Sequence, residues 1–222
     1  MRGAIAFFDA IAERYDKDYI LDAPTSRERM RAVVTLIASA GRRVLDLGVG
    51  TGRELPQLLD GGFEVTGLDA SQAMLDVCAR RARPIPLVLA DFFAPLPFAD
   101  ESFDAVIALH GTLAHPEAPE SFVNLGREIA RVLAPGGVFI AEAPSPGWVD
   151  AVARGAADDR ARRAVALDVQ RTEHEDVRTG ARAVVVTLSD AEWHTALGPS
   201  FGEIAVEPLS AVEWRIVARR AV

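Results

Sequence analysis

Strand-like and helix-like segments alternate over residues 42–144, and this alternation most constrains the fold of the chain. It favours a parallel sheet covered by helices on both faces, because parallel neighbours need a crossover connection. The predicted strands are residues 42–47, 64–69, 86–91, 103–110 and 138–143. The predicted helices are residues 53–60, 71–83 and 120–133, with Ser71 as an N-cap.

The flanking regions have a looser pattern. Helices are predicted before the first strand and again after the fifth, followed by a hairpin, a short helix and two antiparallel strands. These segments are residues 5–14, 26–40, 148–168, 170–177 with 181–188, 190–197, and 204–209 with 213–218. The chain is therefore expected to form one α/β domain.

The first predicted strand ends in a glycine-rich turn, Asp46-Leu-Gly48-Val-Gly50-Thr-Gly52. Glycines let the backbone turn tightly and approach a ligand where a Cβ would clash. Asp69 ends the second predicted strand, about 20 residues further on, where a carboxylate can accept hydrogen bonds from ribose hydroxyls. The pattern predicts a pocket for a ribose-bearing cofactor.

Two residues of this turn bear on the type of cofactor. A nicotinamide-binding fingerprint ends in a glycine or alanine that allows close helix–strand packing, and Arg53 occupies that position here. Asp46 adds an acid inside the strand, which suits a cationic amine or sulfonium better than a pyrophosphate. A nicotinamide-dependent oxidoreductase remains an alternative at this point.

Residues 44–52 resemble the first motif of class I S-adenosylmethionine-dependent methyltransferases. Further segments fit the family in order, namely residues 67–71, 89–92, 96–98 with 102–106, and 131–137. Val49 stands where the family often has cysteine, serine or alanine. This position acts mainly through its backbone, so the departure does not put cofactor binding in doubt. The resemblance implies a Rossmann-like three-layer sandwich whose seven-stranded, mostly parallel sheet has the order 3-2-1-4-5-7-6, with strand seven antiparallel.

The resemblance also implies a division of residues 1–222 and a set of cofactor contacts. Residues 1–41 would be a helical lid, 42–144 the cofactor-binding core, 145–190 a substrate-side insertion, and 191–222 a terminal helix and strand pair. Asp69 would bind the ribose and Asp91 the adenine amino group. The full set of expected cofactor contacts is Asp46, Gly48, Gly50, Gly52, Asp69, Ala70, Asp91, Phe92 and His110.

The acceptor side is expected beyond strand four, because ligands of such sheets bind at the carboxyl ends of the strands. His110 follows that strand directly and is a candidate general base or cofactor contact, and His115 is a second candidate on the following loop. Structural roles for both histidines remain alternatives. Tyr15 and Tyr19 are candidate lid residues over the substrate, and Trp148 could line its pocket.

Other residues are expected to be structural. His174 and His194 have no supporting context, and we expect them at the surface. Cys78 is the single cysteine, so an internal disulfide is excluded, and a buried position on a helix is expected. No histidine, aspartate and glutamate spacing suits a metal, so none is predicted.

The composition of the chain limits the classes of partner that it is expected to bind. The net charge of −8 argues against a general nucleic-acid binder, which needs a basic face. No apolar run approaches the roughly 20 residues of a membrane span, and acids follow the short apolar start at once, so a cytoplasmic protein is expected. We expect a monomer or homodimer that methylates a small-molecule acceptor with S-adenosylmethionine. A cofactor-binding protein without transferase activity, or a relative using a modified cofactor, remains an alternative.

Overall fold

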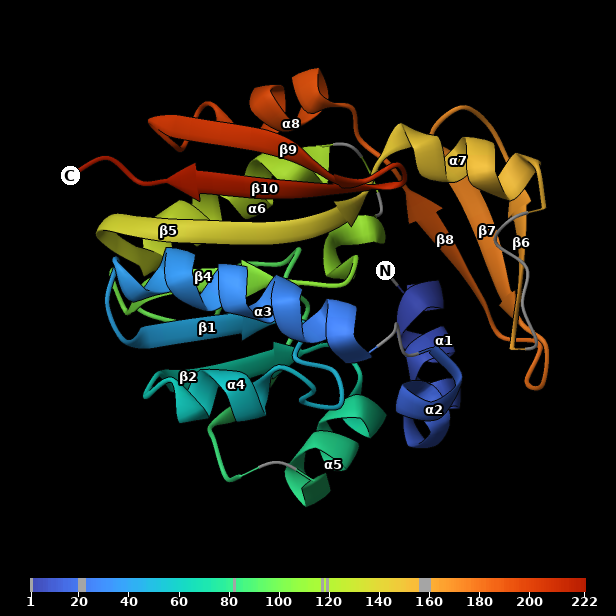
Figure 1. Cartoon of the computed structure of the whole chain (residues 1–222), viewed down its shortest axis with the longest axis horizontal. Coiled ribbons are helices and arrows are strands. Elements are labelled where there is room, and N and C mark those ends of the chain that lie inside the picture. Colours follow the sequence, from blue (N-terminus) through green and yellow to red (C-terminus); the bar gives the residue numbers. More distant parts are fainter. Residues whose placement is uncertain (1, 20–22, 82, 117, 119, 156–160) are drawn as a thin grey trace.

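A seven-stranded sheet organises the computed structural model, which describes residues 2–19, 23–81, 83–116, 118, 120–155 and 161–222 (Figure 1). Its order is β3-β2-β1-β4-β5-β10-β9, and only β10 runs antiparallel, against both β5 and β9. The strands are β1 Arg43–Leu47, β2 Glu64–Asp69, β3 Leu87–Leu89, β4 Phe103–Ala108, β5 Leu133–Pro144, β9 Glu203–Ser210 and β10 Glu213–Arg219. This confirms the predicted fold class and strand order.

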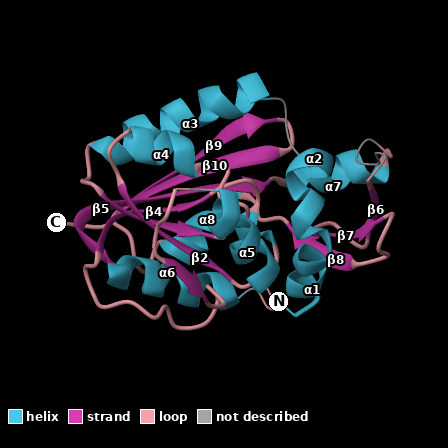
Figure 2. Cartoon of the chain, turned by 90° about the horizontal axis from the view of Figure 1, so that it is seen from below, coloured by secondary structure: helices cyan, strands magenta, loops and turns pink. Residues whose placement is uncertain are grey.

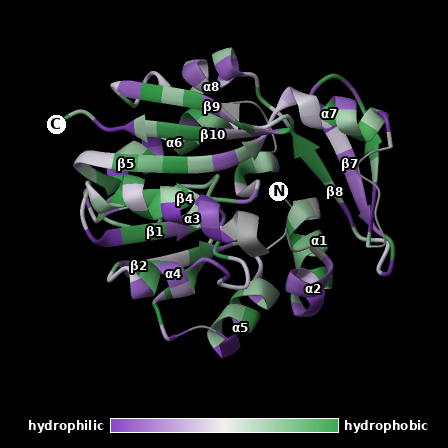
Figure 3. Cartoon of the chain, viewed as in Figure 1, coloured by the Kyte–Doolittle hydropathy of each residue, from purple (hydrophilic) through white to green (hydrophobic). Residues whose placement is uncertain are grey.

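Helices cover both faces of the sheet because its central strands are apolar on both sides. Val44 packs with α3 and α4 on one face, and its neighbour Leu45 packs with α6 and α8 on the other. Figure 2 shows α3 and α4 on the opposite side of the sheet from α6, and Figure 3 shows hydrophobic residues concentrated in the strands. The helices are α3 Ala23–Ala38, α4 Leu55–Asp60, α5 Gln72–Arg81, α6 Glu120–Val132 and α8 Asp190–Leu197.

A second, smaller sheet lies beyond the carboxyl end of β5, in the order β6-β7-β8 (Figure 1). It is formed by β6 Arg162–Ala166, β7 Arg171–Asp176 and β8 Arg182–Val186, all antiparallel. The predicted hairpin over β7 and β8 is thereby confirmed. Helix α1 Arg2–Ile11 packs against β8, and the 3₁₀ turn Ala12–Arg14 and α2 Tyr15–Tyr19 follow it.

The predicted helix over residues 148–168 is wrong. Helix α7 spans only Pro146–Ala153. It ends where Gly155 adopts a left-handed φ of 72°, the usual conformation of a helix C-terminal glycine. The later residues form β6, in which Val165 pairs with Glu173 of β7. Pairing with the predicted hairpin therefore overrides the helix preference of this alanine-rich stretch.

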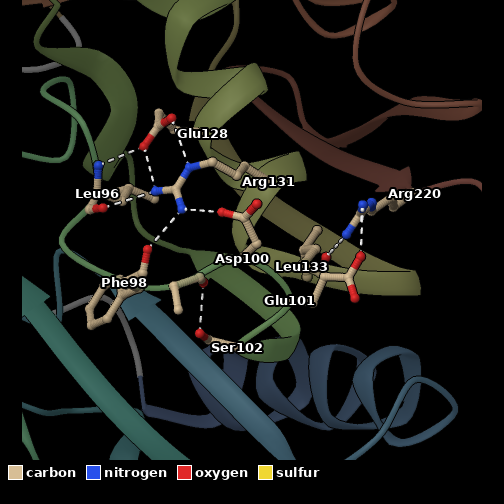
Figure 4. A network of polar contacts seen from close by, with 10 residues as sticks. Leu96, Phe98, Asp100, Glu101, Ser102, Glu128, Arg131, Leu133 and Arg220 are labelled. Carbon is tan, nitrogen blue, oxygen red and sulfur yellow. Dashed lines mark hydrogen bonds and ion pairs between the residues drawn. The ribbon is translucent and has the colours of Figure 1, made fainter.

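Arg131 of α6 fixes the long loop between β3 and β4 (Figure 4). Its guanidinium donates to the carbonyl oxygens of Leu96 at 2.9 Å and Phe98 at 2.8 Å, and to the carboxylates of Glu128 and Asp100, each at 2.8 Å. Hydrogen bonds to Glu128 and Asp100 raise the pKa of the Arg131 guanidinium, so it stays charged. One helical side chain thus anchors the loop whose first residues reach the pocket described next.

Candidate active site

A pocket opens at the carboxyl ends of β1, β2 and β4, with about 860 Å³ of space, part of it open to solvent. The predicted cofactor residues that line it are Asp46, Gly48, Gly50, Asp69, Ala70, Phe92 and His110. Gly52 and Asp91 lie outside the lining. The Gly52 amide donates to Val49 O at 2.9 Å, and Asp91 Oδ1 accepts from the Phe93 amide at 2.8 Å, so both shape loops in this structure.

The glycine turn forms one wall of the pocket through its backbone. Gly48 and Gly50 have φ values of 70° and 53°, which side chains rarely adopt. A Cβ on Gly48 would lie 2.3 Å from Thr112 Cγ2. The Gly48 amide donates to Leu68 O at 2.7 Å, which ties the turn to β2. Glycine at this position therefore allows the turn to pass close to the loop after β4.

Asp69 joins the glycine turn to the start of α5. Its Oδ2 accepts from the Gly50 amide and its Oδ1 from the Ser71 amide, both at 2.9 Å. Burial raises the pKa of Asp69, and these two amide hydrogen bonds oppose that rise. A carboxylate oxygen has further lone pairs, so Asp69 can also accept from ligand hydroxyls. Ser71 Oγ accepts from the Met74 amide at 3.1 Å, which confirms the predicted cap.

Two buried carboxyl groups, those of Asp46 and Glu54, also line the pocket. Asp46 and Glu54 are 3% and 8% exposed, and Asp69 lies within electrostatic range of Asp46. Burial, and then the charges of Glu54 and Asp69, raise the pKa of Asp46 well above its usual value. Asp46 Oδ2 accepts no hydrogen bond from the part of the chain that the structure describes. A buried carboxyl without a partner fits a ligand that brings a positive charge.

His110 lies beside this acidic group, in a strained conformation. Its φ is 54°, uncommon for a residue with a side chain. Its Nε2 lies 2.6 Å from Glu54 Oε1, and both side chains are largely buried. Burial disfavours the charged form of Glu54, but the His110 hydrogen bond and charge outweigh burial and lower the pKa of Glu54. Glu54 was missed in the sequence, although it directly follows the turn.

His115 closes the side of the pocket nearest the small sheet. Its Nδ1 lies 2.7 Å from Val184 O of β8, and its ring meets Phe8 of α1 edge to face, with centroids 5.4 Å apart. Burial lowers the pKa of His115. His115 thus lies at the pocket, as the predicted role requires, and also links the β4 loop to α1 and β8.

A second cavity of about 1390 Å³ continues from the first, again partly open to solvent. The two share Phe8, Tyr15, Arg53, His110, Gly111 and His115. Trp148 of α7 lines the second cavity, and its role at the substrate stays a prediction. The side chain of Tyr19 lies outside the described residues. The loop after β4 therefore lies at the boundary between the two cavities.

The expected surface position of His174 is wrong. His174 is 7% exposed and lines the second cavity, with Nε2 3.0 Å from Thr172 Oγ1. Alternate residues of β7 face inward, which also buries Thr172 and Asp176. The inward and outward alternation expected of a strand in the predicted hairpin could have indicated that His174 is buried. His194 is exposed, as predicted, and Cys78 is buried on α5, as predicted.

Residues 45–141 match the family described as methyltransferase domain. Over 137 residues the chain is 39% identical to a demethylmenaquinone methyltransferase from Renibacterium salmoninarum, an alignment covering 61% of this chain and 56% of that protein. The central part of this chain is therefore similar to methyltransferase domains. It spans about half the length of the curated relatives it matches.

Solved structures agree with this methyltransferase fold along nearly the whole chain. The CcbJ methyltransferase from Streptomyces caelestis superposes with a TM-score of 0.72 at 22% identity, covering 96% of each chain. The PH0226 protein from Pyrococcus horikoshii gives a TM-score of 0.71 at 22% identity, covering 93% of this chain and 95% of that one. The likeness therefore includes the segments outside the matched family region.

The cofactor of this methyltransferase family is S-adenosylmethionine, and two parts of the site fit it. The part with Asp46, whose Oδ2 is unpartnered among the described residues, suits the cationic methionine part. The part with Asp69, and with Ala70 and Phe92 also in the lining, suits the ribose and adenine. Within the described residues, no group of three metal-ligating side chains is placed to hold a metal ion, and no helix is long and apolar enough to cross a membrane.

Proposed function

We propose that this chain transfers the methyl group of S-adenosylmethionine to a small-molecule acceptor and releases S-adenosylhomocysteine. The observation that carries this proposal is the continuity of the two cavities at His110, His115 and Arg53. When bound, the cofactor supplies an electrophilic methyl group on a sulfonium. The protein then has to align an acceptor with that methyl group and exclude water.

The N-terminal helices support this role by covering the cofactor pocket. Asp16 Oδ1 accepts from Thr51 Oγ1 at 2.6 Å, and its Oδ2 lies 2.6 Å from Arg81. Ser71 Oγ donates to Asp9 at 2.6 Å. These contacts hold α1 and α2 against the glycine turn and α5. Residues 2–19 therefore form the lid in our proposal, whereas α3 packs on the sheet.

A small-molecule acceptor is favoured over a macromolecule by the shape and charge of the chain. The second cavity lies between α1, the small sheet and α7, which limits the size of a bound acceptor. The net charge of −8 disfavours nucleic acid. Similar proteins carry the name demethylmenaquinone methyltransferase, which refers to a small acceptor. Our proposal includes a cytoplasmic location, which the single, buried cysteine supports, and a monomer or homodimer.

Among the predicted site residues, His110 is proposed to act at the transfer step. It lies where the two cavities meet, and its Nε2 is engaged by Glu54. Its Nδ1 has no hydrogen-bond partner among the described residues, so the neutral ring can accept a proton there from a neutral acceptor. His115, Tyr15 and Trp148 are proposed to bound the acceptor, because all three line the second cavity.

Calorimetric titration of S-adenosylhomocysteine tests the cofactor half of this proposal. Asp69→Ala removes a charged acceptor of hydrogen bonds, worth about 1.5–3 kcal/mol, so affinity should fall about 10- to 150-fold. Asp69→Asn keeps one acceptor oxygen beside Gly50 and Ser71, so it separates ligand loss from loop collapse. The exposed Asp60→Ala is the control. Equal affinity in wild type and both Asp69 variants would overturn the ribose assignment.

The transfer half is tested by turnover. Release of S-adenosylhomocysteine should depend on an added acceptor from a panel of hydroxyl, amine and carboxyl compounds. His110→Ala should slow that release more than it weakens cofactor binding. Tight cofactor binding with no turnover across the whole panel would favour a binding protein without transferase activity.

A further inference from the structure

Two aromatic rings form part of the wall of the second cavity. The rings of Trp148 and His174 lie with centroids 5.6 Å apart and planes inclined by 36°, and Arg162 Cζ lies 5.6 Å from the Trp148 ring centroid. Burial first, and then the charges of Arg162 and His115, lower the pKa of His174 to about 3. The imidazole is therefore neutral at physiological pH, and both rings belong to the lining of the second cavity.

The carboxylates that line this cavity are already neutralised. Asp18 lies 2.7 Å from Arg14 and 3.1 Å from Arg178. Glu213 lies 2.6 Å from Arg29. A cationic acceptor would have to compete with these arginines, so the acids of the cavity offer it little attraction.

Arg53 differs from the other charged groups at the junction of the cavities. It lines both cavities, is half-buried, and forms no ion pair or side-chain hydrogen bond with another residue of the described ranges. Its neighbour Glu54 is engaged by His110 at 2.6 Å. The positive charge reaches Tyr15, where it opposes the rise in pKa that burial causes. Arg53 is thus a cation with five donors available to a ligand.

We propose that the acceptor is a flat aromatic compound with an acidic hydroxyl or carboxyl group, its ring along Trp148 and its ionised oxygen toward Arg53. This rests on the proposed function, because it assigns the second cavity to the acceptor. An arginine beside an oxygen acid favours the ionised form and binds it with charge-assisted hydrogen bonds. Because Arg53 lies where the cavities meet, the oxygen it holds is the one that faces the methyl donor.

The reaction is then O-methylation. The acceptor oxygen, ionised by loss of its proton to His110 or water, forms a bond to the methyl carbon with its own electron pair. The carbon–sulfur bond breaks, and its electron pair stays on sulfur. A negative oxygen and a positive sulfonium thereby become a neutral ether or ester and a neutral thioether, so atoms and charge balance.

Two isosteric probes, 1-naphthoate and 1-naphthamide, test this assignment by calorimetry on protein saturated with S-adenosylhomocysteine. Wild type should bind the acid at least about tenfold more tightly than the amide. Arg53→Met should bring the two affinities together while leaving the affinity for S-adenosylhomocysteine unchanged. Trp148→Ala should weaken both probes about three- to tenfold. Arg83→Met, which removes an exposed arginine, is the matched control and should keep the wild-type ratio.

Each contrary outcome is informative. Equal binding of the two probes to wild type, or binding of neither, overturns the proposal without need of a variant. An unchanged ratio in Arg53→Met also overturns it. So does a loss of S-adenosylhomocysteine affinity in Arg53→Met that matches the loss for naphthoate, because Arg53 would then hold the cofactor carboxylate. Absence of S-adenosylhomocysteine binding to wild type, by contrast, removes the proposed function itself.

Discussion

Asp46→Asn should make the ligand-free protein more stable and the cofactor complex weaker. Asp46 is 3% exposed, one of its oxygens has no partner among the described residues, and the carboxyls of Glu54 and Asp69 are near. An amide has the same shape without the charge. The substitution therefore removes a negative charge that destabilises the ligand-free protein. The cationic cofactor is expected to compensate that charge when it binds.

The sign and size follow from the burial of Asp46. Its pKa in the folded protein is raised above the ordinary value of 3.8, so the folded state holds this proton more tightly than the unfolded state does. The associated stability is complete below about pH 4 and is lost as the pH rises through the folded pKa. The amide keeps an unpartnered polar group, so the substitution removes only the cost of a buried charge beside two other carboxyls, on the order of 1–2 kcal/mol. We expect Asp46→Asn to recover about 1–2 kcal/mol at pH 8, or a melting temperature higher by about 2–8 °C.

Thermal melts of wild type and Asp46→Asn between pH 5 and 9 check this, with the exposed Asp60→Asn as control. The gap between wild type and Asp46→Asn should widen as the pH rises, and saturating S-adenosylhomocysteine should stabilise wild type more than Asp46→Asn. A lower melting temperature for Asp46→Asn at pH 8, or equal ligand stabilisation of both proteins, would refute the reasoning.

Three further substitutions have defined outcomes. Gly48→Ala should abolish S-adenosylhomocysteine binding by calorimetry, because its Cβ would lie 2.3 Å from Thr112 Cγ2 at a φ of 70°, and wild-type affinity would contradict this. Arg131→Met should lower the unfolding free energy in urea by about 2–3 kcal/mol, since two loop carbonyls lose a charged donor; an unchanged midpoint would count against that anchor. His174→Phe should reduce acid destabilisation, because the depressed pKa of about 3 makes folding lose stability as pH falls below the unfolded value of 6.5. Parallel wild-type and His174→Phe stability curves from pH 7 to pH 4 would show this interpretation to be wrong.

Local patterns were enough to predict the central sheet and much of the cofactor pocket. The turn from Gly48 to Gly50 is specified by adjacent residues, and Asp69 follows at the end of the next strand, so both reach one edge once the strands are parallel. Gly52 and Asp91 belong to the same motifs but lie outside the lining, because a motif does not determine which way each loop residue turns.

Residues that depend on distant segments were not predictable in the same way. Glu54 becomes part of the site only because His110, from another strand end, lies 2.6 Å away. His174 is buried because β7 pairs with both β6 and β8, and β6 lies in a stretch whose local composition favours a helix. In each case the packing of separate segments overrode local propensity.

The central claim is that this pocket binds S-adenosylmethionine rather than a nicotinamide cofactor. Parallel calorimetric titrations of wild type with S-adenosylhomocysteine and with NADH test it most directly. We expect saturable one-to-one binding of S-adenosylhomocysteine and no binding heat with NADH. Saturable NADH binding without S-adenosylhomocysteine binding would contradict the account.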